Sequence, residues 1–158
     1  VFLADGARII GDVIILEQAN IWYNVTIRGD VNYIRIGKRA NIQDNSVVHV
    51  AYKSYPTLIG DDVTIGHSAV IHACTIHNSC LIGMGAIILD GAVINEGSLV
   101  AAGTLIPKGK EFPPYSLLMG NPAQIKRTLT EKEIQDIHWS AGHYVRLAAN
   151  YSLDLSSI

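Results

Sequence analysis

Aliphatic residues recur every six positions along most of the chain, from Ile36 to Val48, from Ile59 to Ile71 and from Ile76 to Ile106. A period of six fits neither an α-helix, with about 3.6 residues per turn, nor a single strand, whose side chains alternate. Hexapeptide repeats are typical of a parallel β-helix, in which each repeat forms a short strand and a turn, and three repeats form one coil. The pattern therefore predicts a mainly β fold of this kind. The same rhythm is found upstream at Ile10, Ile15, Ile21 and Ile27.

A second position of the repeat, four residues after most of the aliphatic ones, is small or β-branched. Cysteine stands at or near this position twice, at Cys74 and Cys80, where a buried thiol acts as a small hydrophobic group. We expect both thiols to be unpaired, as in a reducing cytoplasm, rather than joined in a disulfide. The residues at this position are Ala19, Val25, Val31, Ala40, Ser46, Val63, Ala69, Cys80, Ala86, Ala92, Ser98 and Thr104.

Three repeats per coil assign each strand to one of three faces. The residue after each aliphatic side chain points outward, so Arg28, His49 and His72 stack on one face, named face C. Stacked parallel strands lie about 4.8 Å apart, which suits two imidazoles that share one metal ion with bonds of about 2.0–2.1 Å. His49 and His72 are therefore candidate metal ligands. Face A begins at Ile36, Ile59 and Ile76, face B at Ile42, Ile65 and Ile82, and face C at Ile10, Ile27, Val48, Ile71 and Ile88.

A third histidine, His67, belongs to face B and completes the spacing H-x17-H-x4-H. A corner of the coil separates it from the other two, so within one chain the three cannot easily converge. A neighbouring subunit that docks its face B on face C would bring them together, and we therefore expect a homotrimer. Three imidazoles leave one position open for water, as in catalytic zinc sites, and Fe²⁺ or Co²⁺ also accept imidazole. No role is assigned to the other histidines, His77, His138 and His143.

Polar residues beside these histidines are further candidates for the site. Arg28 and Asp30 could orient a neighbouring group or hold the interface, or form a surface ion pair of little consequence. Gln43 and Asp44 occupy the coil position next to His67. They could belong to the site or be plain turn residues.

Departures from the six-residue rhythm mark the remaining parts of the chain. Residues 1 to about 9 are expected to cover the open end of the coil. Insertions at Asp30–Arg35 and Val50–Leu58 stand beside the candidate ligands, and loops on a rigid frame often carry function. Met119–Ala123 is a turn signal, and a capping box at Thr130–Glu133 begins an amphipathic helix that we expect to lie along the coils.

The composition indicates one soluble domain with few charges: 49% of the 158 residues are hydrophobic, 16% are charged, and the net charge is −2. This balance, without basic runs, argues against nucleic acid and anionic membranes as partners. No apolar stretch approaches the roughly 20 residues of a membrane helix, and the first residues show no leader pattern. We expect a cytoplasmic protein in which residues 1–118 form the β-helix domain and residues 119–158 a turn and helix packed on it.

The following motifs, taken together and in this order, are specific enough to suggest a protein family. They are Ile27-Arg-Gly-Asp30, Asn41-Ile-Gln-Asp44, His49, Gly66-His-Ser-Ala-Val-Ile-His72 and Gly120-Asn-Pro-Ala123. Over almost the entire chain the sequence resembles the γ-class carbonic anhydrases, a family of left-handed β-helix trimers. The resemblance implies a left-handed coil and the reversible hydration of carbon dioxide to bicarbonate.

The resemblance also implies roles for the residues that match these motifs. His49 and His72 would bind a metal together with His67 of the partner subunit. Arg28 and Asp30 would form an ion pair between subunits and help to bind bicarbonate. The metal would be Zn²⁺, with Fe²⁺ or Co²⁺ as alternatives.

Gln43 would position the nucleophile that the metal generates from water, Asp44 would help to fix the site, and Tyr144 of the terminal helix would lie near it.

One departure from the family concerns the proton released by hydration. The best-known member has a glutamate after the Arg-Gly-Asp aspartate and an acidic loop after the first histidine. This chain has Val31 and the loop Val50–Leu58, which holds no carboxylate. We therefore expect weak activity that depends on buffer as the proton carrier.

Two other classes of function share this fold. A hexapeptide acyltransferase would use one histidine as a general base and hold acyl-CoA between coils. A trimeric binding or assembly protein would retain the metal only to hold its interface. Measurement of metal content distinguishes the acyltransferase from a carbonic anhydrase. A carbon dioxide hydration assay distinguishes the binding or assembly protein from a carbonic anhydrase.

Overall fold

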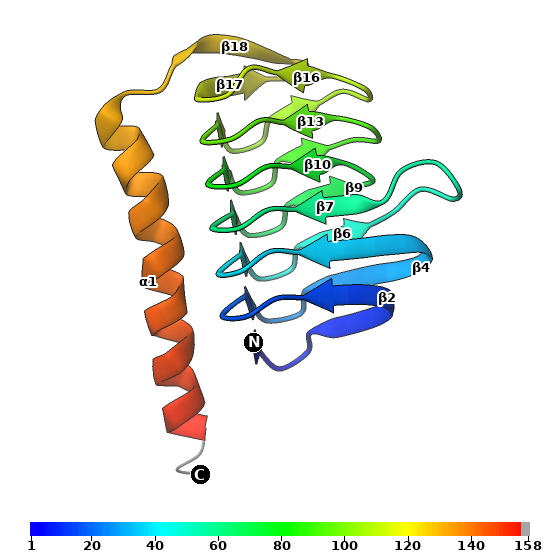
Figure 1. The fold of residues 1–158 in the computed structure, drawn as a ribbon, viewed down its shortest axis with the longest axis vertical. Coiled ribbons are helices and arrows are strands. Elements are labelled where there is room, and N and C mark those ends of the chain that lie inside the picture. Colours follow the sequence, from blue (N-terminus) through cyan, green and yellow to red (C-terminus); the bar gives the residue numbers. More distant parts are fainter. Residues whose placement is uncertain (156–158) are drawn as a thin grey trace.

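The chain winds into a parallel β-solenoid with one long helix alongside (Figure 1). The computed structural model describes residues 1–155. In Figure 1 the strands nearest the viewer run to the left and those behind run to the right while the chain climbs from its N-terminal end. This sense of rotation makes the coil left-handed, in agreement with the family resemblance.

Face B forms a sheet of eight strands, parallel except for the last pair. Most of its strands are two residues long, because a turn follows each repeat. In spatial order they are β1 (Phe2–Leu3), β3 (Asn20–Ile21), β5 (Asn41–Ile42), β8 (Thr64–Ile65), β11 (Leu81–Ile82), β14 (Leu99–Val100), β17 (Ser116–Gly120) and β18 (Ala123–Thr128).

Faces A and C belong to one sheet because β4 (Thr26–Ile36) is long enough to take part in both. Its first residues pair with the face C strand that carries His49, and its last residues pair with the first short strand of face A. The expected insertion Asp30–Arg35 is thus part of a strand and not a separate loop. Face C continues through β6 (Val47–His49), β9 (Val70–His72), β12 (Ile87–Ile88) and β15 (Leu105–Ile106), and face A through β7 (Thr57–Ile59), β10 (Thr75–Ile76), β13 (Val93–Ile94) and β16 (Glu111–Phe112).

Aliphatic side chains fill the interior in continuous stacks, as the repeat predicts. On face C, Ile27, Val48, Ile71 and Ile88 are all 0% exposed and in register. The small position is also buried from Ala19 to Thr104, with the exception of Val31, which is 41% exposed. Val31 was wrongly placed there, because β4 continues through this point without turning into the interior.

The first coil departs from the predicted register. Its strand β2 (Arg8–Ile15) pairs Ile9 with Ile27 and Ile10 with Arg28. Ile10 is therefore not the inward residue of face C, and it is 43% exposed. The register shifts between Gly11 and Val13, where Gly11 has a φ of +81° that a side chain would strain.

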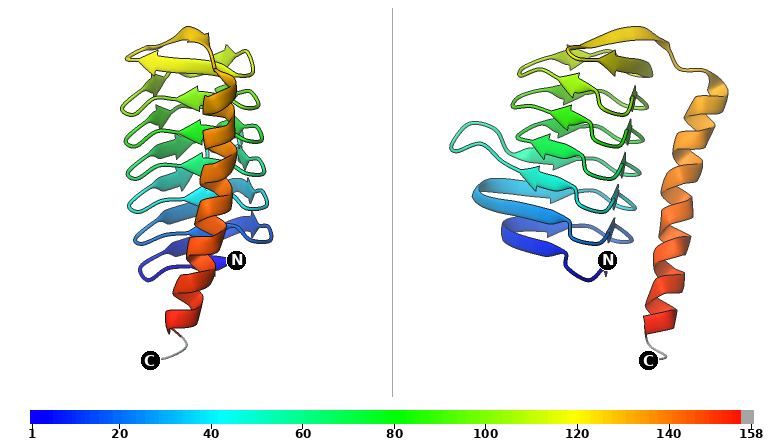
Figure 2. Two further views of the ribbon diagram at one scale, coloured as in Figure 1. Left: turned by 90° about the vertical axis from the view of Figure 1, so that its left-hand side faces the viewer. Right: turned by 180° about the vertical axis from the view of Figure 1, so that it is seen from behind.

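A hairpin of β17 and β18 closes the C-terminal end, and the helix α1 (Glu131–Leu155) then runs back along face B (Figure 2). The capping box forms as predicted, since the Glu133 carboxylate accepts from the Thr130 N–H at 2.8 Å. The helix is amphipathic as predicted, and its apolar residues Ile137, Ala141 and Ala148 are buried. No helix in the described part of the chain is long and apolar enough to cross a membrane. The division expected after residue 118 falls inside β17, and residues 156–158 lie outside the described part.

Candidate metal centre

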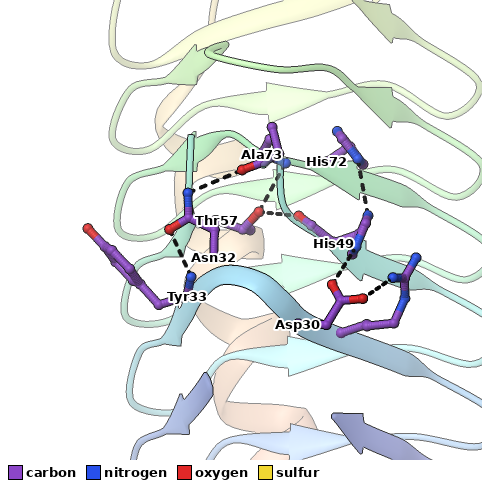
Figure 3. Close-up of polar contacts among 9 residues, drawn as sticks. Asp30, Asn32, Tyr33, His49, Thr57, His72 and Ala73 are labelled. Carbon is purple, nitrogen blue, oxygen red and sulfur yellow. Dashed lines mark hydrogen bonds and ion pairs between the residues drawn. The ribbon is translucent and has the colours of Figure 1, made fainter. Parts of the chain in front are cut away.

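Two histidines face each other on adjacent strands of face C. The register of β6 and β9 pairs His49 with His72. The Nδ1 atom of His49 lies 3.2 Å from the Nε2 atom of His72 (Figure 3). Two nitrogens that bind one tetrahedral metal at about 2.0–2.1 Å lie about 3.3–3.4 Å apart. The pair is therefore spaced as two ligands of one ion would be.

Carboxylates hold the remaining nitrogen of each ring. Asp30 Oδ1 lies 3.0 Å from His49 Nε2, and Asp90 Oδ1 lies 2.6 Å from His72 Nδ1. A carboxylate that accepts a hydrogen bond from one ring nitrogen places the proton there and leaves a lone pair on the other. The two lone pairs are then on the two nitrogens that face each other. This arrangement fits a cation between the rings.

Asp90 was not among the predicted site residues. It follows the buried Ile88 of β12 by two positions, one coil beyond His72. In the sequence, Asp90 is marked only by its position at the end of a face C repeat. That position points to the site only when the register of the strands is known.

Asp30 and Arg28 lie beside the pair, as predicted. Arg28 Nη1 donates to Asp30 Oδ2, while the other carboxylate oxygen meets His49 (Figure 3). The hydrogen bond with His49, followed by the one with Arg28, lowers the pKa of Asp30 below its ordinary value. Asp30 is therefore charged at neutral pH and joins the arginine to the histidine.

His67 lies apart from this pair, on the turn that joins β8 to β9. His67 and Ser68 form the turn at the corner, and β9 carries the chain from Val70 to His72 along face C. His67 Nδ1 has its own carboxylate, since Asp44 Oδ2 of the preceding coil lies 2.8 Å away. Among residues 1–155, no group of three histidine, cysteine, aspartate or glutamate side chains is arranged to hold a metal. One chain thus brings together His49 and His72 and leaves His67 at its own corner.

Gln43 is held by a buried chain of amides. Its Nε2 atom donates to Asn41 Oδ1 at 2.9 Å, and Asn41 Nδ2 donates to Asn20 Oδ1. Trp22 Nε1 also donates to Asn20 Oδ1, at 2.9 Å. One N–H of the Gln43 amide is therefore committed to Asn41, which orients the amide and leaves its oxygen and its second N–H for other partners. Asn41 was not predicted to contribute, although the alternation about Ile42 puts it on the same side as Gln43.

Tyr144 reaches face B from the helix and lies near the His67 corner. Its ring packs against that of Trp22 edge to face, with centroids 5.7 Å apart. Burial, followed by the charge of Asp44, raises the pKa of Tyr144. Tyr144 therefore lies on the side of the coil that carries Asp44 and His67, and not on the side of the His49–His72 pair.

The loop between β6 and β7 projects from the solenoid directly after His49 (Figures 1 and 2). It is closed by a hydrogen bond from the Ala51 N–H to the Tyr55 carbonyl at 3.1 Å. Asn32 of β4 anchors it by donating to the Ala51 carbonyl at 3.2 Å. Tyr52 and Tyr55 are exposed.

The fold and the repeat define a hexapeptide-repeat protein, and the model of the family "Bacterial transferase hexapeptide (six repeats)" matches residues 73–108. The chain is 55% identical to a probable carbonic anhydrase of Methanocaldococcus jannaschii, over 92% of this chain and 91% of that protein. It is 49% identical to the mitochondrial gamma carbonic anhydrase 2 of Arabidopsis thaliana, over 94% of this chain, and spans 55% of that longer protein.

A solved structure from Bacillus cereus, of a protein described provisionally as an acetyltransferase, is also similar. It has a TM-score of 0.93 and 44% identity, and the match covers 95% of this chain and 87% of that one. The likeness to the carbonic anhydrases extends along nearly all of this chain. The chain belongs to the γ-class carbonic anhydrase-like family.

Proposed function

We propose that the protein catalyses the reversible hydration of carbon dioxide at a metal centre shared between the subunits of a homotrimer. One observation carries the proposal. The nitrogens of His49 and His72 that face each other at 3.2 Å are those that Asp30 and Asp90 leave unbound. The arrangement is that of two metal ligands with fixed tautomers.

His67 of the partner subunit would complete the ligand set. It carries the same kind of carboxylate contact, with Asp44 at 2.8 Å, which leaves its Nε2 atom available to a metal. Three imidazoles suit Zn²⁺, Fe²⁺ or Co²⁺. When bound, the metal supplies Lewis acidity, which makes water a nucleophile near neutral pH.

The other residues bind and orient the reactants. The amide oxygen of Gln43, whose orientation is set by the N–H donated to Asn41, would accept a hydrogen bond from water at the centre. Arg28 places a permanent positive charge beside the histidine pair, where the bicarbonate anion forms. Asp30 keeps the guanidinium and the His49 ring together. The reaction also releases one proton, which buffer must carry away in the absence of a carboxylate in the loop.

The separation of the ligands on two faces of the coil supports a homotrimer, in which each centre takes ligands from two subunits. Face C carries two histidines and an outward stripe of Val47, Val70 and Ile87, which are 40%, 36% and 37% exposed. Apolar side chains of this kind are stabilised when a second subunit covers them. Docking of the partner's His67 corner on face C would bury the stripe and complete the centre.

The test combines metal content with activity. We expect protein purified without chelator to contain about one metal ion per chain, to hydrate carbon dioxide in strong buffer and to lose both properties in His49→Ala. Protein with stoichiometric metal and no hydration would favour the binding or assembly function. Protein that takes up no metal would overturn the proposal and favour the acyltransferase class.

A further inference from the structure

Buried hydroxyls bridge backbone groups at three corners of the solenoid. Ser46, Thr57 and Ser98 are each 0% exposed. Each hydroxyl donates to one backbone carbonyl and accepts from one backbone N–H. A buried hydroxyl with both bonds satisfied fixes the distance between the two backbone groups that it joins.

Ser46 holds the turn that carries His67. Its Oγ atom donates to the Gly66 carbonyl at 3.0 Å and accepts from the Ala69 N–H at 3.2 Å. These two backbone groups bracket His67 on either side. The next two coils have alanine at the equivalent position, Ala69 and Ala86, which shows that packing alone does not require a hydroxyl there.

Thr57 ties together the backbones of the other two histidines. Its hydroxyl donates to the His49 carbonyl and accepts from the N–H of Ala73, the residue after His72, at 3.0 Å (Figure 3). Ala73 also donates to the His49 carbonyl, at 3.0 Å. The equivalent positions of the next two coils, Cys74 and Ala92, carry no hydroxyl.

Ser98 forms the same bridge at a corner with no candidate ligand. It donates to the Pro113 carbonyl at 3.4 Å and accepts from the Ser116 N–H at 3.2 Å. Ser98 therefore shows what the bridge does for the fold alone. It provides a matched control for Ser46, with the same side chain and the same burial.

We propose that Ser46 and Thr57 are positioning residues of the metal centre, which act through the backbone to set where the three histidine side chains meet. This inference rests on the proposed function, because it presumes that the histidines bind a metal. Ser46 sets the turn of His67, and Thr57 sets the spacing of the strand ends that carry His49 and His72.

The first experiment compares Ser46→Ala with Ser98→Ala by titration with Co²⁺. Metal affinity is measured by competition with a chelator, the visible cobalt spectrum is recorded, and the melting temperature is taken without metal. We expect both variants to lose a similar amount of thermal stability. Only Ser46→Ala should bind Co²⁺ more weakly, by about tenfold to a hundredfold, and show an altered spectrum.

A second comparison, between Thr57→Val and Thr57→Ser, does not depend on how Ser46→Ala folds. Valine keeps the shape and removes the hydroxyl, so we expect the same loss of Co²⁺ affinity, which serine restores. Affinities equal to wild type in both Ser46→Ala and Thr57→Val, alongside a normal loss of stability, would overturn the inference and leave the proposed function standing. Failure of the wild-type protein to bind Co²⁺ would overturn the proposed function and the inference with it.

Discussion

Each candidate ligand is paired with one carboxylate: His49 with Asp30, His67 with Asp44 and His72 with Asp90. A neutral imidazole has two tautomers, and only one of them leaves the lone pair where a metal would be. The carboxylates select that tautomer before any metal arrives. In the proposed centre, metal affinity would therefore depend on carboxylates that do not contact the ion.

Asp90→Asn tests this dependence. An amide is a weaker acceptor than a carboxylate, so we expect metal affinity to fall by about tenfold to a hundredfold while the fold is retained. Affinity is measured by chelator competition, and folding by circular dichroism. Asp12→Asn is the control, since it removes the exposed ion pair with Arg35 on face A and should bind metal normally. Equal affinities in the two variants would contradict the role of Asp90.

Val31 bears on the fate of the proton. It is 41% exposed and directly follows Asp30, at the place where the best-known family member has a glutamate. We expect the hydration rate to rise with buffer concentration, and Val31→Glu to raise the rate in dilute buffer, as measured by stopped flow with a pH indicator. A wild-type rate that stays high as buffer is diluted would reveal a proton carrier elsewhere in the chain.

At the scale of elements, the beginning of α1 depends on Glu133. Its carboxylate accepts from Arg127, from the Thr130 N–H and from the Thr130 hydroxyl. The hydrogen bond from Arg127, followed by those from Thr130, lowers the pKa of Glu133 to about 2. A carboxyl with a lowered pKa in the folded state stabilises the fold above its unfolded pKa, near 4.3, and loses that contribution as pH falls towards 2.

Glu133→Gln should therefore lower the melting temperature at pH 7 but change it little near pH 2. The difference between variant and wild type should decrease as pH falls through this window, as followed by thermal denaturation. Lys132→Gln is the control, because its ion pair with Asp136 is exposed on the same helix. A difference that stays constant between pH 7 and pH 2 would show that the charge of Glu133 does not matter.

The repeat made most elements predictable, because a six-residue period leaves only one way to bury its aliphatic residues. It failed where strands are longer than one repeat. Ile10 was misplaced because β2 shifts register beyond Gly11, and Val31 because β4 continues without a corner. Of the site, the histidines could be found from their type and spacing. Asp90 and the amide chain through Asn41 could not, since ordinary polar residues become informative only when register brings them together.

At the scale of the whole molecule, the separation of His67 from the other ligands gives a test by subunit mixing. His49→Ala and His67→Ala damage opposite sides of one interface, so each variant alone should lose the metal from every site. After the two are unfolded and refolded together in equal amounts, a site is intact where face C comes from a His67→Ala chain and the corner from a His49→Ala chain. Random assembly gives a chance of about one half for each, and about a quarter of the wild-type metal content should return.

A mixture of His49→Ala and His72→Ala is the control, because both lesions lie on face C and no pairing repairs them. Metal recovery in that control would contradict a shared site. So would the absence of recovery in the first mixture despite proven subunit exchange.

The register of the stacked coils limits which insertions and deletions the chain can accept during evolution. Thr75 lies opposite Val93 and Leu81 opposite Leu99, each eighteen residues further along. Loss or duplication of eighteen residues beyond Asp90 would rejoin strands in phase and leave the histidine strands with the same neighbours. Loss of six or twelve residues would keep the interior side chains inside but move the C-terminal hairpin and helix to another face, and loss of a number that is not a multiple of six would turn interior side chains outward. We therefore expect related chains to differ in length in this region by one whole coil. Such a change would leave the histidine strands and their neighbours unaltered.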